Sequence, residues 1–436
     1  MSANLTITAD WEPLEIGSPE ERACFAAIGI QAHNQWLTEG RDAPANRLRQ
    51  KPLLPGYHLA EWLAWNWWRL RWEPRSRAAD WEFAHRVASI GGGYIWPNIT
   101  IFSDGERTAL IAKPTIEQPQ TPFRYIADVA AVIPAAEFES ELDRFVEGVV
   151  EQLDSAGVEE TNLHTVWKSV CDERRNTEEA RKRKLEALLG SDPDKADART
   201  IDQLLKDADQ LSEPAIEEIA AEHGQGGKIL TAVQIRDIAK QSGFDASPED
   251  IVKLDEPVQL PSRGLVPAWL VGREAARALR AQLGLSVEPI SDTTLAKMGG
   301  ASRETISSKT VGPDISFAFD QGTNRSRVVL RSKWRTGRRF EFTRLLGDRL
   351  TRQGVGRLCP ATRAYTYRQK MQRSFAAEFL SPFEAVDEML AGDYSTENQL
   401  DVAEHFEVSP LTVRTLLVNN GRLEREDLNE ELESAA

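Results

Sequence analysis

Hydrophobic and polar positions alternate in two short segments near residue 100, a pattern typical of paired β-strands. Residues 98–102 and 107–112 flank Asp104-Gly105, and an Asp-Gly pair between alternating segments is a strong signal for a β-hairpin. A further strand is predicted over residues 127–133. Because helical segments precede the hairpin, we expect residues 1–135 to form an α+β domain.

Helical periodicity replaces this alternation after residue 135. The first apolar stripe at three- and four-residue spacing consists of Phe138, Leu142, Phe145, Val149 and Leu153. Further helices are predicted over 161–189, 200–211 and 214–222. Helical spacing returns between Ile229 and Leu254, where Ser247-Pro248 predicts the start of another turn. We therefore expect residues 136–262 to form a helical connector.

The last part of the chain mixes both periodicities. The predicted elements are a helix over 274–285, strands over 315–319 and 327–330, a helix over 338–350, and helical segments over 375–382 and 399–417. In the helix 338–350, four residues share one side and are predicted to pack inward: Phe340, Thr343, Gly347 and Leu350. The whole pattern predicts a multidomain α+β protein.

Tryptophan marks the N-terminal domain. Nine of the twelve tryptophans lie between Trp11 and Trp96, and five of them fall within residues 58–72. On a helix these rings cover nearly the whole circumference, so we expect the helix to be buried. The alternative is that the rings form a platform on which nucleic acid bases stack.

Length and composition are those of a multidomain globular protein. The chain has 436 residues, of which 41% are hydrophobic, and domains commonly take about 100–200 residues. No run of about 18 apolar residues and no signal-peptide layout is found, so we expect a cytoplasmic protein without a membrane segment. Three scattered cysteines, Cys24, Cys171 and Cys359, indicate neither a disulfide framework nor a cysteine-based zinc site.

Charge is distributed very unevenly along the chain. The net charge is −15, and residues 137–256 alone hold 30 acidic and 15 basic residues. Residues 325–373 hold 15 basic and only 2 acidic residues, a local net charge of +13. An acidic protein would ordinarily bind phosphates poorly, but this basic block is a candidate for nucleic acid or nucleotide binding.

The helix 338–350 lies in the middle of the basic block. Arg344 and Asp348 are separated by four residues, the spacing of the two zinc-binding histidines in a His-Glu-x-x-His peptidase helix. The residue after the first histidine is the general base in such helices, and here that position is Leu345.

The order of the C-terminal segments resembles the ImmA/IrrE family of zinc metallopeptidases. The resemblance covers roughly residues 265–423 and rests on the helix 274–285, the helix 338–350, the segment Phe375-Ala376-Ala377-Glu378-Phe379-Leu380-Ser381-Pro382 and the helical pair over 399–417. It implies a zincin-like domain over residues 263–395, followed by a helix-turn-helix-like module over 396–423. Residues 424–436 are an acidic tail that we expect to be frayed.

Every functional position implied by this resemblance is altered. The zinc histidines fall on Arg344 and Asp348, the catalytic glutamate falls on Leu345, and the third ligand falls near Gln369 to Met371, where no carboxylate occurs. Zinc needs deprotonated nitrogen, oxygen or sulfur ligands, and an arginine repels it. We therefore expect no catalytic residue, no bound metal and no cofactor in this domain, which the resemblance makes a pseudopeptidase.

Two interpretations of the altered helix remain open. Arg344 and Asp348 form a salt bridge in place of the metal, or the basic residues turn the cleft into an anion site. The candidate anion-binding residues are Arg331, Lys333, Arg335, Arg338, Arg339, Arg344, Arg349 and Arg352. The block could equally meet the acidic connector of the same chain or an acidic protein partner.

The terminal module has a predicted small core. Ser409 and Pro410 are suited to begin its second helix, and the predicted core residues are Ala403, Phe406, Val408, Val413 and Leu416. Arg414 is alone on the second helix, so a structural or dimerising role is favoured over DNA reading.

These observations lead to one functional hypothesis and two rivals. The hypothesis is a non-catalytic regulatory or sensor protein that binds a protein partner or a nucleic acid. The family resemblance suggests a toxin–antitoxin, stress or phage-defence setting for it. The first rival is an enzyme with Cys359 as nucleophile, activated by Arg357 and Arg363. The second rival is a DNA-binding transcriptional regulator.

Overall fold

The computed structural model describes residues 4–76, 78–115, 121–258, 260–310, 312–322, 324–352 and 356–424. The fold is mixed α+β, as predicted. The chain forms two compact units. Unit 1 comprises residues 1–205, 220–226 and 364–366, and unit 2 comprises residues 206–219, 227–363 and 367–436.

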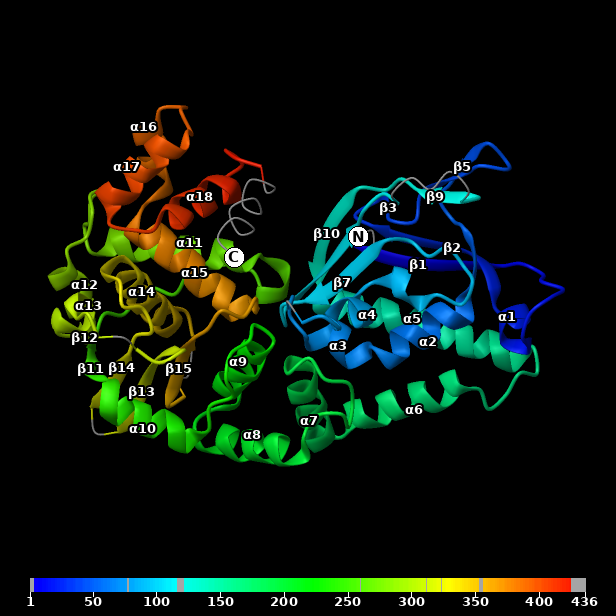
Figure 1. Ribbon diagram of the computed structural model, residues 1–436, viewed down its shortest axis with the longest axis horizontal. Coiled ribbons are helices and arrows are strands. Elements are labelled where there is room, and N and C mark those ends of the chain that lie inside the picture. The colour runs from blue at the N-terminus through cyan, green and yellow to red at the C-terminus, as the bar shows by residue number, and fades with distance from the viewer. Residues whose placement is uncertain are drawn as a thin grey trace. The chain divides into compact units, whose positions relative to one another are not determined.

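Unit 1 contains three antiparallel sheets (Figure 1). The first is built from β1 (Leu5–Trp11), β2 (Phe25–Ala32), β3 (Gln35–Trp36) and β6 (Leu53–Pro55). The second has the order β10-β8-β7, with β7 (Ile99–Ser103), β8 (Arg107–Ala112) and β10 (Val129–Pro134). The third pairs β4 (Gly40–Asp42) with β5 (Arg47–Arg49) and β9 (Phe123–Tyr125). The predicted hairpin is confirmed, because β7 and β8 pair through register Ile101↔Leu110.

The helices of unit 1 contact strands of the first two sheets or pack on one another. They are α1 (Pro19–Ala23), α2 (Gly56–Trp65), α3 (Trp67–Trp72), α4 (Trp81–His85), the 3-10 helix η1 (Val87–Ile90), α5 (Ala135–Ser155), α6 (Asn162–Arg175) and α7 (Thr177–Leu188). The apolar stripe of α5 and residues of α6 and α7 belong to the same hydrophobic core as the strands. The division therefore differs from the predicted one, since the first half of the proposed connector is part of unit 1.

The tryptophan-rich segment forms two helices instead of one. Asn66 ends α2, and α3 begins at Trp67. Trp67 and Trp68 are buried in the core, but Trp65 is 53% exposed. The prediction that this helix is buried all round is therefore wrong at Trp65, which lies on the side of α2 that the core does not cover.

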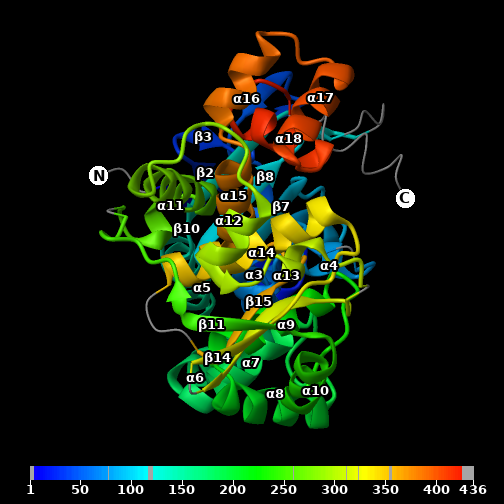
Figure 2. The ribbon, with the colours of Figure 1, turned by 90° about the vertical axis from the view of Figure 1, so that its left-hand side faces the viewer.

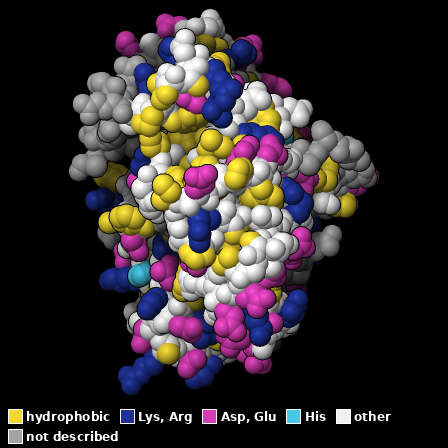
Figure 3. Space-filling model, turned by 90° about the vertical axis from the view of Figure 1, so that its right-hand side faces the viewer, with side chains coloured by type: hydrophobic (Ala, Val, Ile, Leu, Met, Phe, Trp, Pro, Cys, Tyr) yellow, Lys and Arg dark blue, Asp and Glu magenta, His cyan; other side chains and the backbone are white. Residues whose placement is uncertain are grey.

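The surface of unit 1 carries other hydrophobic side chains. Figure 3 shows the face that lies on the right in Figure 1, where hydrophobic side chains reach the surface between charged ones. Ile16, Leu48 and Leu53 are examples of exposed apolar residues in this unit. Single exposed apolar residues are ordinary on soluble proteins, so they carry no functional meaning by themselves.

Unit 2 is organised around one five-stranded antiparallel sheet with the order β12-β11-β14-β13-β15. Its strands are β11 (Phe244–Ile251), β12 (Gly299–Ala301), β13 (Ser316–Gly322), β14 (Arg325–Val329) and β15 (Leu358–Ala361). The predicted turn at Ser247-Pro248 is wrong, because this dipeptide lies within β11. The helical spacing of residues 232–239 belongs to a helix that ends at Ser242. The segment that follows is extended because it pairs with β14.

Helices cover this sheet in two layers (Figure 2). The helix α14 (Arg335–Thr351) packs against β15 and against α15 (Tyr367–Leu380), and α15 packs against α11 (Ala268–Gln282). The other helices of unit 2 are α10 (Ala232–Ser242), η2 (Arg263–Leu265), α12 (Asp292–Met298), α13 (Glu304–Ser307), α16 (Phe383–Leu390), α17 (Thr396–Phe406) and α18 (Pro410–Asn419). Helices α8 (Ala198–Gln210) and α9 (Glu213–His223) each have residues in both units. In the described part of the chain, no helix has the length and apolar character needed to cross a membrane.

Candidate functional site

Helix α14 lies at the centre of unit 2 and is buried over most of its length. Thr343 and Gly347 are fully packed, as predicted, whereas Phe340 and Leu350 are only partly buried at the edge of the core. A Cβ atom on Gly347 would lie 2.5 Å from the ring of Phe375 on α15. The glycine therefore allows α14 and α15 to approach closely, which brings their polar side chains together between the two helices.

Arg344 is one of these polar side chains. Its Nη2 atom donates to the carbonyl oxygen of Thr362 at 2.6 Å and to Oε1 of Gln369 at 2.5 Å, with a longer contact of 3.4 Å to Gln372. Gln369 also accepts from the backbone N–H of Thr362 at 2.8 Å. The guanidinium group is buried, so these oxygens compensate for the water that it loses.

Asp348 forms the second buried cluster, one turn further along α14. Arg368 on α15 binds its two carboxylate oxygens through Nε at 2.8 Å and Nη2 at 2.6 Å, and Arg352 lies 3.6 Å away. Burial disfavours ionisation, but these two guanidinium groups outweigh it and hold the pKa of Asp348 well below its usual range. The predicted salt bridge of Asp348 thus has Arg368 as its partner in the described contacts.

Cys359 on β15 belongs to the same cluster. Its Sγ atom lies 3.0 Å from Oδ2 of Asp348 and donates to it. Burial and the neighbouring Asp348 carboxylate raise the pKa of the Cys359 thiol, despite the attraction of Arg368 and Arg349. The expectation that flanking arginines lower this pKa is wrong, because the thiol is buried beside a carboxylate. A protonated and inaccessible thiol is a poor nucleophile.

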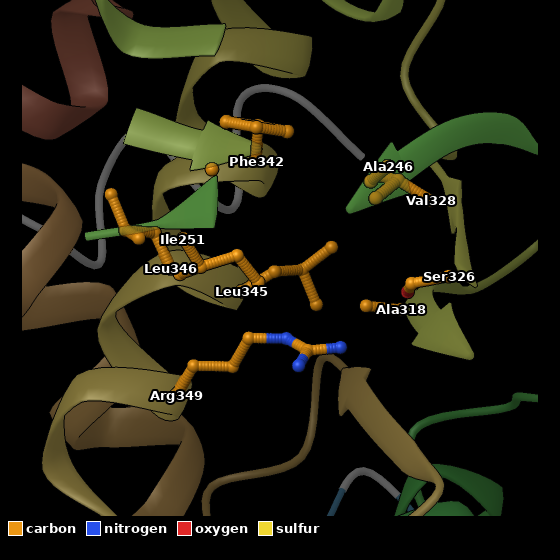
Figure 4. A pocket seen from close by; sticks show the side chains of 10 residues that line it. Ala246, Ile251, Ala318, Ser326, Val328, Phe342, Leu345, Leu346 and Arg349 are labelled. Carbon is orange, nitrogen blue, oxygen red and sulfur yellow. The ribbon is translucent and has the colours of Figure 1, made fainter. Parts of the chain in front are cut away.

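Leu345 points from α14 toward the sheet (Figure 4). It is 3% exposed and lines a cavity of about 20 Å³ together with Ala318, Ser326, Val328 and Phe342. This volume is about the space of one water molecule. The position that the resemblance assigns to the general base is therefore an apolar side chain in the packed space between α14 and the sheet.

The residues at the three implied ligand positions do not suit zinc. Arg344 and Gln369 are hydrogen-bonded to each other, and Asp348 lies one turn from Arg344. A guanidinium group cannot donate a lone pair, and the carboxylate of Asp348 is already bound by Arg368. Within the described residues, no group of three or more His, Cys, Asp and Glu side chains is arranged to hold a metal ion.

The N-terminal half of α14 carries a second arginine network. Arg339 is fully buried and binds Asp292 of α12 and the carbonyl oxygen of Ile290. Arg335 binds the other Asp292 oxygen at 2.6 Å and reaches Glu407 at 2.7 Å. Burial opposes ionisation of Asp292, but the hydrogen bonds from Arg335 and Arg339 prevail and lower its pKa. These arginines therefore bind acids of their own unit.

The other candidate anion-binding residues are engaged as well. Arg338 is buried and donates to the carbonyl oxygens of Thr305 and Ser332. Arg331 pairs with Glu341, and Arg349 pairs with Asp320. Lys333 is exposed, and its Nζ atom lies 5.0 Å from the ring centroid of Trp334. The ion pairs described for residues 325–373 involve Asp245, Asp292, Asp320, Glu341, Asp348 and Glu407, of which Asp245 lies in the predicted acidic connector. Arg338, Arg339, Arg344 and Arg368 are buried, whereas Arg325, Lys333, Arg335, Arg357 and Arg363 are exposed. The block is thus partly core and partly surface.

The terminal module has the predicted core. Ala403, Phe406, Val408, Val413 and Leu416 are buried, and Ser409 caps α18 by accepting from the backbone N–H of Thr412. Asp401, Glu404 and Pro410 are exposed, and Arg414 is half-buried. The acidic tail lies outside the described residues apart from its first residue, Glu424.

Sequence reasoning missed the partners that neutralise α14. Neither Arg368 nor Asp292 is among the predicted site residues, although Arg368 immediately precedes Gln369 in the sequence. Periodicity places Arg368 on a helix but does not say which helix lies opposite. Asp292 stands at the first position of a helix beginning after Ser291, a common place for a solvated acid, so no local signal indicates its pairing.

Comparison of the chain with protein-family models, curated proteins and solved structures produced no match.

Proposed function

We propose that this protein is a non-catalytic regulatory or sensor protein that uses unit 2 as an ImmA/IrrE-like pseudopeptidase scaffold to bind a protein partner. The observation that carries the proposal is the replacement at the implied zinc site. Arg344, Asp348 and Gln369 stand at the three ligand positions, and they are joined with Arg368 and Cys359 in buried hydrogen-bond clusters.

The environment of Leu345 supports the non-catalytic part of the proposal. Hydrolysis by a zincin needs a general base and space for a substrate beside the metal-binding helix. Leu345 supplies no base, and the cavity that it lines has a volume of about 20 Å³. A peptide main chain does not fit beside α14 at this point.

The state of the basic block favours a protein partner over a nucleic acid. Phosphate binding needs accessible lysines and arginines, whereas Arg335, Arg339 and Arg349 are paired with carboxylates of unit 2. Trp334, at the start of α14, is 68% exposed between Lys333 and Arg335. Exposed tryptophan and arginine are the side chains most enriched at energetically important positions of protein interfaces.

The proposal depends on the alignment of α14 with a zinc-binding peptidase helix, and the zinc content of the purified protein tests this alignment. We expect the wild-type chain to contain far less than one zinc per molecule. The variant Arg344→His, Asp348→His, Gln369→Glu should bind about one zinc, because it places three suitable ligands at the convergent positions. The variant Arg344→His, Asp348→His, with only two new ligands, is the matched control. Circular dichroism checks that each variant folds, and zinc contents are compared between folded variants and the wild-type chain.

Two results would contradict this proposal. Stoichiometric zinc in the wild-type protein would overturn the alignment with the zinc-binding helix. A folded ligand variant that binds no zinc would show that Arg344, Asp348 and Gln369 do not occupy ligand positions.

Partner binding is tested with repressor and antitoxin proteins, the classes that the family resemblance suggests. We expect a complex on gel filtration and an intact partner on electrophoresis after incubation with added zinc. Trp334→Ala should weaken the complex by about tenfold or more if this ring is central to the interface.

Cleavage of the partner would refute a non-catalytic role. Tight binding to duplex DNA or RNA that falls steeply with salt and with Lys333→Ala would favour a nucleic acid partner instead.

A further inference from the structure

A surface pocket of about 260 Å³ lies on unit 1, far along the chain from α14. It is lined by α2, α4 and η1, and its lining residues are His58, Glu61, Trp62, Trp65, Asn66, Phe83, Ser89 and Ile90. We call it the α2–α4 pocket. Its volume approaches the lower end of the range for small-molecule sites, which is about 300 Å³.

Aromatic rings dominate the wall of the α2–α4 pocket. Trp62 and Trp65 are three residues apart on α2 and so lie on the same side of the helix, while Phe83 comes from α4. Trp65 is 53% and Phe83 is 72% exposed. Large aromatic side chains that gather at a surface hollow, instead of in the core, are a typical feature of a binding site.

Polar contacts hold this wall together. The indole N–H of Trp62 donates to the carbonyl oxygen of Phe83 at 3.3 Å, and the Ser89 hydroxyl donates to the same oxygen at 2.7 Å. These bonds connect α2 to the segment that carries Phe83 and Ser89. The indole N–H of Trp62 is thereby used within the protein, and its ring remains as an apolar surface.

A carboxylate adds negative charge to the pocket. Oε1 of Glu61 accepts from the Tyr57 hydroxyl at 3.0 Å and from Nδ2 of Asn162 at 2.7 Å. These two neutral donors fix the carboxylate and leave its charge uncompensated, and no partner is described for Oε2. His58, also in the lining, is bound to Glu21 at 3.1 Å. None of the lining residues is a lysine or an arginine.

The aromatic wall and the carboxylate together distinguish a site for organic cations from a site that stacks nucleic acid bases. A pocket that stacks nucleic acid bases needs neighbouring cations for the phosphates, and its lining here offers Glu61 instead. Indole faces beside a carboxylate attract organic cations, and quaternary ammonium ions are the best-known ligands of such sites. We propose that the α2–α4 pocket binds a small quaternary ammonium ion, with Trp62, Trp65 and Phe83 around its methyl groups and Glu61 balancing its charge.

The proposal is independent of the proposed function of unit 2 and is tested by calorimetry on the full chain. Choline and tetramethylammonium should bind with a measurable dissociation constant, and dimethylbutanol, the neutral carbon isostere of choline, should not. Trp65→Ala should weaken choline binding roughly two- to fivefold, the range expected for one exposed cation–π contact. Glu61→Gln, which keeps the shape and an oxygen acceptor, should weaken it by a similar factor.

Trp334→Ala is the matched control, because it removes an exposed tryptophan outside the pocket and should leave choline binding unchanged. Equal binding of choline and dimethylbutanol would show that the pocket binds apolar groups regardless of charge, and would overturn the proposal. So would the absence of choline binding at tens of millimolar, or an unchanged dissociation constant in Trp65→Ala. Binding of adenosine monophosphate that depends on Trp65, without binding of choline, would assign the pocket to nucleobases instead.

Discussion

Helices α2 and α14 have opposite compositions and opposite surroundings. α2 belongs to an aromatic segment and would be expected inside, yet Trp65 is exposed beside a surface pocket. α14 carries five arginines among its 17 residues and would be expected to line a charged cleft, yet Arg338, Arg339 and Arg344 are buried. The difference teaches that burial depends on the partners available. α14 has Asp292 within reach of Arg339, and Thr362 and Gln369 within reach of Arg344, whereas the core of unit 1 is filled without Trp65.

The largest effect is expected from removing the α14 carboxylate that binds the buried Arg368 of α15. Asp348→Ala leaves Arg368 buried without its bidentate partner, and should lower the free energy of unfolding by roughly 3–5 kcal/mol. Urea denaturation of the full chain measures this loss. Asp10→Ala is the control, because it breaks an exposed pair with Lys51 and should cost less than about 1 kcal/mol. Equal effects of the two variants would show that the Asp348 cluster is not a buried charge network.

The contrast within the aromatic segment is expected to be nearly as large. Trp67→Ala removes a buried ring from the core of unit 1 and should destabilise the protein by about 3 kcal/mol. Trp65→Ala, three positions after Trp62, should change stability by less than about 1 kcal/mol because the ring is half outside the core. Thermal unfolding of both variants checks the order. A larger loss for Trp65→Ala would contradict the assignment of this ring to the surface.

Acid should weaken unit 2 through the same carboxylates. The pKa values of Asp348 and Asp292 are lowered in the folded state, so their contribution is complete above the unfolded value of about 4 and is lost as pH falls below it. Asp348 should contribute a loss of about 1 kcal/mol by pH 3, and Asp292 should add to it in the same direction. Urea denaturation at several pH values measures this slope. Asp348→Asn should flatten it, and an unchanged slope would argue against a depressed pKa.

The smallest effect concerns Tyr57 beside the α2–α4 pocket. Burial and the carboxylate of Glu61 raise the pKa of Tyr57 to about 12. Glu61→Gln removes the negative charge and should bring this pKa part of the way back toward 10, as followed by ultraviolet titration. Tyr57→Phe identifies the signal of this tyrosine among six. No change in the titration would show that the Glu61 charge does not reach this side of the pocket.

Local sequence signals predicted the elements whose cause is local. The Asp-Gly pair predicted the hairpin of β7 and β8, and the apolar stripe of α5 predicted its buried face. The small core of α17 and α18 was also predicted from spacing. The strand β11 was not, because residues 244–251 become extended through pairing with β12 and β14, which are distant in sequence.

The candidate site shows the same division. The spacing of Arg344 and Asp348 could be read from the sequence, and so could the lack of a carboxylate near Gln369 to Met371. The partners of Asp348 could not, since Arg368 and Cys359 reach it only after α15 and β15 pack against α14. The α2–α4 pocket likewise needs Phe83 and Glu61 to meet across separate helices.

The sequence by itself determined the α+β class, most of the helices and the uneven distribution of charge. Only the tertiary structure decided that several arginines of the basic block pair with acids of unit 2 and that one tryptophan of the aromatic segment faces a pocket. Periodicity reports the conformation and the faces of a single segment. Burial and charge compensation depend on contacts between segments far apart in the chain, and these exist only in the folded protein.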